Sequence, residues 1–170
     1  MFDGLDDIDW EQYGECHIAM GMKTKAIPQS IRNMLHDDPE EREYAIQDIL
    51  GEGQHLGNLD HATPAIIPFV LEVLEDTKYR ERGYLMLGLS LMCDSLFYSE
   101  RVSYMRLALK TFEAIKQGFP LYKRLIDDSE QETRLYTVIV LGWMQDDASE
   151  VVDVLLERLK IETDEEVRIE

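Results

Sequence analysis

The chain has 170 residues, of which 45% are hydrophobic, so it can bury the core of one domain and is not a wholly disordered chain. Its 35 acidic and 17 basic residues give a formal net charge of −18, which argues against a phosphate-backbone binder and against docking on an anionic membrane. The longest nearly apolar run, 84–93, is too short to cross a bilayer. The first residues lack the pattern of a secretory signal, and Cys16 and Cys93 are far apart, so we expect free thiols in a cytoplasmic protein.

Apolar residues recur at helical spacing, and no segment alternates with the period of a strand, so we predict an all-α fold. In chain order, we predict helix pairs at 27–53, 66–95, 118–144 and 151–170, with an extra helix over 99–117. Together they form one domain over 1–170.

Several helix starts carry capping signals. Asp38 is expected to cap the second helix of the first pair, with Pro39 at the first helical position. Ser129 and Thr163 each stand three residues before a glutamate, a spacing that predicts capping boxes in the third and fourth pairs.

The helix pairs share a repeated residue pattern. Fourteen residues after a proline stands an arginine, and a tyrosine follows two residues later. The prolines are Pro28, Pro68 and Pro120, the arginines are Arg42, Arg82 and Arg134, and the tyrosines are Tyr44, Tyr84 and Tyr136. A fourth copy fits with Val154 in place of the proline and Arg168 as the arginine. Six residues before the four arginines stand His36, Asp76, Asp128 and Glu162. A residue pattern that recurs in successive helix pairs predicts an α-α superhelix, which is a HEAT/armadillo-like solenoid of about three and a half repeats.

The spacings Asp76–Arg82 and Asp128–Arg134 resemble the Asp-to-Arg ladder of HEAT repeats. A wider resemblance to a family of uncharacterised bacterial HEAT-repeat proteins covers DIDWEQYG, IPQSIRNMLHDDPEEREYAI, HLG, HATPAIIPFVLEVLED and GFPLYKRLIDDSEQETRLYTVIVLG. It implies an α-α superhelix with a non-enzymatic binding role of the accessory or immunity type, and it supplies no catalytic residues. The fourth unit nearly lacks its second helix, so we expect either a shortened chain or self-association through this uncapped half-repeat.

The ladder residues Arg42, Asp76, Arg82, Asp128 and Arg134 have two interpretations. The arginines could line a groove and clamp carboxylates, or they could tie the turn of one unit to the next. We favour the second interpretation, because charge pairs that recur with a repeat usually fix its register.

The tyrosines recur near the start of each second helix, and second helices normally line the concave side of such a superhelix. We predict a partner-binding surface formed by Tyr44, Tyr84, Leu91, Tyr136 and Trp143. The second helices of the middle units are apolar nearly all round. We expect the extra helix to cover them, and the alternative is an apolar groove.

The remaining candidates for chemistry are few. The loop 51–63 carries His55, Asp60 and His61, but no third nitrogen ligand is in sequence reach, so we expect a binding loop rather than a metal site. The chain has no phosphate-binding glycine motif, and the neighbours Cys16 and His17 would point in different directions on a helix. We therefore predict no catalytic residue, no metal and no cofactor.

The charge is unevenly distributed along the chain. The segment 1–77 has 17 acidic and 4 basic residues (net −13), 78–124 has 4 and 9 (net +5), and 125–170 has 14 and 4 (net −10). We expect a cytoplasmic scaffold that occludes a basic protein partner, such as an effector or toxin, and that binds neither membranes nor nucleic acid directly. The alternatives are a HEAT-type enzyme resembling the alkyl-base DNA glycosylases or the bilin lyases, or an acidic mimic of nucleic acid.

Overall fold

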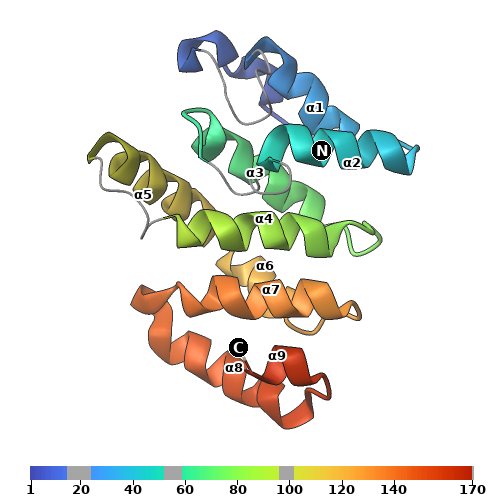
Figure 1. The fold of residues 1–170 in the computed structure, drawn as a ribbon, viewed down its shortest axis with the longest axis vertical. Helices are drawn as coiled ribbons and strands as arrows, with labels where there is room; N and C mark the ends of the chain where they lie inside the picture. The colour runs from blue at the N-terminus through green and yellow to red at the C-terminus, as the bar shows by residue number, and fades with distance from the viewer. Residues whose placement is uncertain (15–23, 52–58, 96–101, 170) are drawn as a thin grey trace.

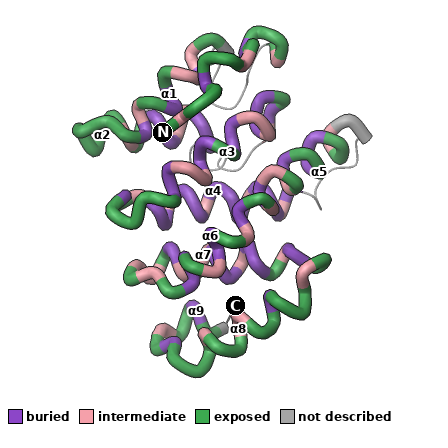
Figure 2. Tube along the Cα trace, turned by 180° about the vertical axis from the view of Figure 1, so that it is seen from behind, coloured by how far each residue is buried: buried purple, intermediate pink, exposed green. Residues whose placement is uncertain are grey.

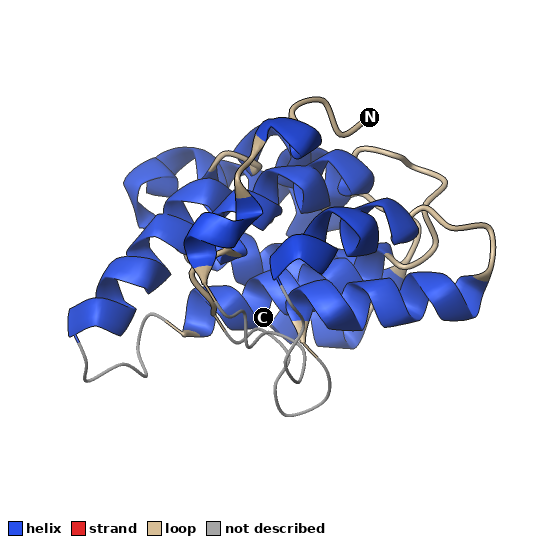
Figure 3. Cartoon of the chain, turned by 90° about the horizontal axis from the view of Figure 1, so that it is seen from above, coloured by secondary structure: helices blue, strands red, loops and turns tan. Residues whose placement is uncertain are grey.

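The computed structural model describes residues 1–14, 24–51, 59–95 and 102–169. These residues form helices joined by turns and contain no strand, which confirms the all-α prediction (Figure 3). The α-helices are α1 (Ile27–Asn33), α2 (Pro39–Leu50), α3 (Thr63–Leu74), α4 (Arg82–Asp94), α5 (Val102–Lys116), α6 (Phe119–Leu125), α7 (Gln131–Gly142), α8 (Ala148–Ile161) and α9 (Glu165–Ile169). No helix among the described residues is long and apolar enough to cross a membrane.

The helices follow one another in pairs along the long axis of the molecule (Figure 1). We call α1/α2, α3/α4, α6/α7 and α8/α9 layers 1 to 4. The second helices α2, α4 and α7 pack side by side, and α7 packs in turn against both helices of layer 4. The extra helix α5 packs against α3 and α4 (Figure 2). Each layer therefore contacts mainly the layers before and after it.

The helix starts show which capping signals are used. Asp38 caps α2 as predicted, since its carboxylate accepts a backbone N–H of the first turn at 3.0 Å and Pro39 opens the helix. The capping boxes at Ser129 and Thr163 are wrong. Asp164 caps α9 instead, with its carboxylate 3.0 Å from a first-turn N–H. An ionised carboxylate is a stronger hydrogen-bond acceptor than a hydroxyl, so Asp164 caps α9 in place of Thr163.

The apolar second helices of the middle layers are enclosed by their neighbours. The helix α4 packs against α2, α3, α5 and α7, and α7 packs against α4, α6, α8 and α9. Both helices therefore bury side chains in several directions, which explains why their sequences are apolar nearly all round. The extra helix α5 covers only part of α4, and most of the covering comes from the adjacent layers.

Two glycines let α4 approach its neighbours closely. A Cβ placed on Gly88 would lie 2.6 Å from Cδ1 of Leu50 in α2, and one on Gly83 would lie 2.9 Å from Cβ of Glu132 in α7. The absence of a side chain at both positions allows these three second helices to stack at short distance.

The N-terminal residues pack onto layer 2. The ring of Phe69 in α3 contacts Phe2 and Trp10, with centroid distances of 6.1 and 6.4 Å. Trp10 is buried, and its indole N–H donates to the carbonyl of Leu5 at 3.0 Å. Residues 1–14 thus extend the hydrophobic core of the helix pairs.

Candidate functional site

The turns that precede α2, α4, α7 and α9 share the same two hydrogen bonds. The first joins a side chain to the backbone N–H two residues later; its acceptors are His36 Nδ1 (3.1 Å) and Asp76 Oδ1, Asp128 Oδ1 and Glu162 Oε1 (2.9 Å each). The second runs from an arginine Nη1 to the carbonyl of that same residue; its donors are Arg42 (2.9 Å), Arg82 (3.3 Å), Arg134 (2.9 Å) and Arg168 (2.8 Å). The six-residue spacing in the sequence therefore reflects the geometry of one repeated turn. An imidazole nitrogen at His36 makes the same contact as a carboxylate oxygen.

We call Arg42, Arg82, Arg134 and Arg168 the ladder arginines, and three of them also reach the next layer. Their ion pairs are Arg42–Glu81 (2.7 Å), Arg82–Asp128 (2.8 Å) and Arg134–Glu162 (2.9 Å). These ion pairs link successive layers. This is the arrangement expected if the ladder residues tie the turn of one unit to the next.

The role assigned to Asp76 needs correction. Its carboxylate is exposed and accepts the N–H of Lys78, while Arg42 directs both Nε and Nη2 to Oε1 of Glu81. Glu81 stands at the start of α4, next to Arg82, and its Oε1 lies 2.7 Å from Nη2 of Arg42 in layer 1. Glu81 therefore makes the tie between layers 1 and 2.

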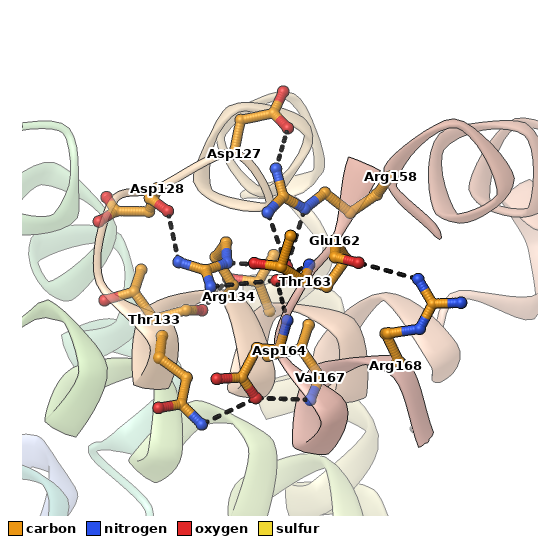
Figure 4. Close-up of polar contacts among 12 residues, drawn as sticks. Asp127, Asp128, Thr133, Arg134, Arg158, Glu162, Thr163, Asp164, Val167 and Arg168 are labelled. Atoms are coloured by element: carbon orange, nitrogen blue, oxygen red, sulfur yellow. Dashed lines mark hydrogen bonds and ion pairs between the residues drawn. The ribbon is translucent and has the colours of Figure 1, made fainter. Parts of the chain in front are cut away.

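The carboxylate of Glu162 is the most enclosed of these acids (Figure 4). Its side chain is 2% exposed and receives hydrogen bonds from Arg134, from Arg158 and from the N–H groups of Thr163 and Asp164. Burial raises the pKa of Glu162, but the hydrogen bonds from Arg134, the Asp164 N–H and Arg158 outweigh it and lower the pKa to about 2. The cluster is therefore a charged clamp that joins layers 3 and 4.

The partner-binding candidates lie on the second helices. Tyr44, Tyr84 and Tyr136 occupy equivalent positions near the starts of α2, α4 and α7, which pack side by side. Three and seven residues after the tyrosines of α4 and α7 follow apolar side chains, so each set lies on one side of its helix. We call these residues the second-helix face: Tyr44, Tyr84, Leu87, Leu91, Tyr136, Ile139 and Trp143.

The residues of this face differ in exposure. Tyr44 is 63% exposed, and the others are partly buried. Partial burial holds the side chains in place while some of their surface stays accessible. Tyr44, on layer 1, is the residue that a partner could contact most fully.

Charged residues flank the tyrosines. Four residues before Tyr44 and Tyr136 stand the exposed Glu40 and Glu132, and four residues before Tyr84 stands the exposed Arg80, in the turn that precedes α4. The pKa of Tyr136 is raised by burial and, to a smaller extent, by the negative charges of Glu132 and Glu166. The face is thus acidic toward layers 1, 3 and 4 and carries one basic residue in layer 2.

The loop candidates are not brought together as a site. His55 lies outside the described residues, and His61 is exposed. Asp60 is buried in the turn before α3, where its carboxylate accepts the N–H of Ala62 at 3.3 Å and its own N–H donates to Thr63 Oγ1 at 2.8 Å. Within the described part of the chain, no group of three or more His, Cys, Asp or Glu side chains is arranged to hold a metal ion.

No protein-family model matches the sequence, and a search of the curated proteins finds no match. We therefore infer the function from the residues and their geometry.

Proposed function

We propose that the chain is a HEAT/armadillo-like α-solenoid of about three and a half repeats. The same two hydrogen bonds recur in the turns of four successive layers, and the ladder arginines link each layer to the next. Nearest-neighbour contacts between similar helix pairs are typical of solenoid proteins.

We further propose that it is a non-enzymatic scaffold that binds a protein partner on the second-helix face. The observation that carries this proposal is the column of three tyrosines at equivalent positions on helices that pack side by side, with Tyr44 63% exposed. Tyrosine and tryptophan are favoured in interfaces, because they offer a large apolar area together with a hydrogen-bonding group. The apolar side chains of α4 and α7 extend this surface.

The charge supports a basic partner. The chain has a net charge of −18, and the exposed Glu40 and Glu132 stand one turn from tyrosines of the face. Opposite charge would accelerate association and exclude acidic competitors. Such binding fits an accessory or immunity-type protein that occludes a basic effector in the cytoplasm.

Affinity capture from an extract of the source organism tests the site. Three forms of the full chain serve as bait: the wild type, the double variant Tyr44→Ala with Tyr136→Ala, and the control Leu109→Ala on α5, whose side chain is 50% exposed. The expected result is one protein retained by the wild type and by the control but lost with the double variant. Equal retention of that protein by the double variant would place the site elsewhere.

The purified partner then tests the electrostatic part of the proposal. We expect the association rate to fall as salt rises from low to physiological concentration, because salt screens long-range attraction. An association rate that does not change with salt would contradict a basic partner while leaving the location of the face untouched.

A further inference from the structure

The turn that precedes α4 departs from the pattern of the other three turns. The helices α2, α7 and α9 begin three residues before their ladder arginine, whereas α4 begins at the ladder arginine Arg82 itself. Residues 79–81 therefore lie outside the helix, at the position where the other layers have their first helical turn. The first of these residues, Tyr79, is 7% exposed, while its equivalents in the other layers are exposed or half-buried. The turn of layer 2 thus places a tyrosine inside the molecule.

A polar cleft lies between this turn and the turn before α2. Its volume of about 260 Å³ is far above the ~10–15 Å³ that admits one water molecule, so a small ligand fits into it. Cations and acids are balanced in its lining, which contains Arg42, Lys78 and Arg80 together with Asp37, Asp76 and Glu81. The charge of the cleft therefore favours neither an anion nor a cation.

Two residues that line the cleft carry a buried polar atom without a hydrogen-bond partner among the described residues. These atoms are the hydroxyl of Tyr79 and Oε2 of Glu81. Glu81 uses its other oxygen, Oε1, for both contacts with Arg42. Burial and, to a smaller extent, the negative charge of Glu81 raise the pKa of Tyr79, so its phenol keeps the proton and can donate it in a hydrogen bond. Because buried polar groups are normally paired, these two atoms beside an open cleft indicate a ligand that both accepts and donates hydrogen bonds.

The cleft also carries two cations that the protein leaves unpaired. Lys78 and Arg80 are exposed, and within the described part of the chain neither lies within ion-pair distance of a carboxylate. An anionic ligand would pair with these cations but would bring a second negative charge to Oε2 of Glu81. A cationic ligand would pair with Glu81 but would lie against Lys78 and Arg80. A ligand that carries both charges avoids both conflicts.

We propose that the cleft binds a small zwitterion of the amino-acid class, with its ammonium group on Glu81 and its carboxylate on Tyr79 and the two cations. The ammonium group donates to Oε2 of Glu81. The carboxylate accepts the hydroxyl proton of Tyr79 in a hydrogen bond and lies beside Lys78 and Arg80. The lining contains no residue of the second-helix face, so this site is separate from the proposed partner surface.

L-Alanine is the probe, because it carries the two charged groups and only a methyl group besides. Ethylamine is the same molecule without the carboxylate, and propionate is the same molecule without the ammonium group. Each compound is titrated into the ¹⁵N-labelled full chain at constant pH and salt, and NMR follows the backbone amides of 76–82. We expect saturable shifts with millimolar L-alanine and about tenfold weaker binding of the other two. Absence of saturable shifts with L-alanine, or equal binding of either fragment, would overturn the proposal.

Two variants test where the zwitterion binds. Tyr79→Phe removes only a hydroxyl that has no partner in the protein, so the variant should fold with unchanged stability and bind L-alanine about tenfold more weakly. Arg80→Gln should weaken binding about threefold, because solvent screens an exposed ion pair. The matched controls Tyr104→Phe and Lys110→Gln on α5 should bind like the wild type. Unchanged binding by Tyr79→Phe would show that L-alanine does not occupy this cleft.

Discussion

The guanidinium of Arg82 and the carboxylate of Asp128 lie 2.8 Å apart, and each side chain is only 9% exposed. The pair joins the start of α4 to the turn before α7, 46 residues further along the chain. Both partners come from the repeated pattern, and the pair links layer 2 to layer 3. Loss of one partner would leave the other charge enclosed without compensation.

Asp128→Asn should therefore lower the free energy of unfolding by about 3 kcal/mol. The asparagine keeps the turn hydrogen bond but cannot balance the charge of Arg82. The matched control is Asp76→Asn, which changes the equivalent turn residue of layer 2, whose exposed carboxylate accepts the N–H of Lys78 and, among the described residues, pairs with no arginine. Its effect should stay within about 0.5 kcal/mol. Urea denaturation measures both, and equal losses would contradict the pairing.

The clamp at Glu162 predicts a loss of stability in acid. The pKa of this carboxyl is lowered from 4.5 to about 2 in the folded protein, so the folded state favours the ionised form. The stabilisation is present above pH 4.5 and is lost as the pH falls from 4.5 toward 2. Glu162→Gln should lower the free energy of unfolding by on the order of 2–3 kcal/mol at pH 7. The difference in unfolding free energy between wild type and variant should shrink toward pH 2. Unfolding curves at several pH values measure this, with the exposed Glu157→Gln as control; a deficit that does not change with pH would refute the assignment.

The close contact of α2 and α4 predicts a strong effect at one glycine. Gly88→Ala should destabilise the protein by about 2 kcal/mol, because the new methyl group would overlap Leu50 in the core. Gly142→Ala is the control, since a Cβ there meets no atom within 4 Å, and its effect should be within about 0.5 kcal/mol of zero. Thermal unfolding compares them. Similar melting temperatures for both variants would show that α2 and α4 are not held this closely.

The thiol of Cys93 should be inert in the folded protein. Burial, together with the negative charge of Asp94, raises the pKa of this thiol to about 12, so almost none of it is thiolate at neutral pH. In a Cys16→Ser background, a disulfide reagent should react slowly with the native protein and rapidly in denaturing urea. Rapid stoichiometric reaction under native conditions would show that Cys93 is accessible.

The sequence predicts the helix pairs well because their apolar spacing and their turns repeat. The position shared by His36, Asp76, Asp128 and Glu162 can be found from the four arginines that follow it, although only the structure shows what the position does. Glu81 could not be found in this way. It stands directly before an arginine and outside the repeated spacing, and its contact with Arg42 depends on how two layers are stacked.

The position of α5 and the packing of Trp10 could not be predicted from the sequence either. Both depend on contacts between segments that are distant in the chain, for which a helical period gives no information. The apolar second helices illustrate the same point, because their pattern fits an exposed groove as well as enclosure by neighbouring layers. The stacking of the layers shows that these helices are enclosed by their neighbours.

Photo-crosslinking to the purified partner tests whether it binds on the second-helix face, because a crosslink locates the contact itself. The partner is the protein obtained by affinity capture, and the photoreactive residue is introduced as Tyr44→p-benzoylphenylalanine on the second-helix face or as Leu109→p-benzoylphenylalanine on α5. We expect a covalent adduct with the partner from position 44 and none from position 109. An adduct from position 109 together with none from position 44 would contradict binding on the second-helix face.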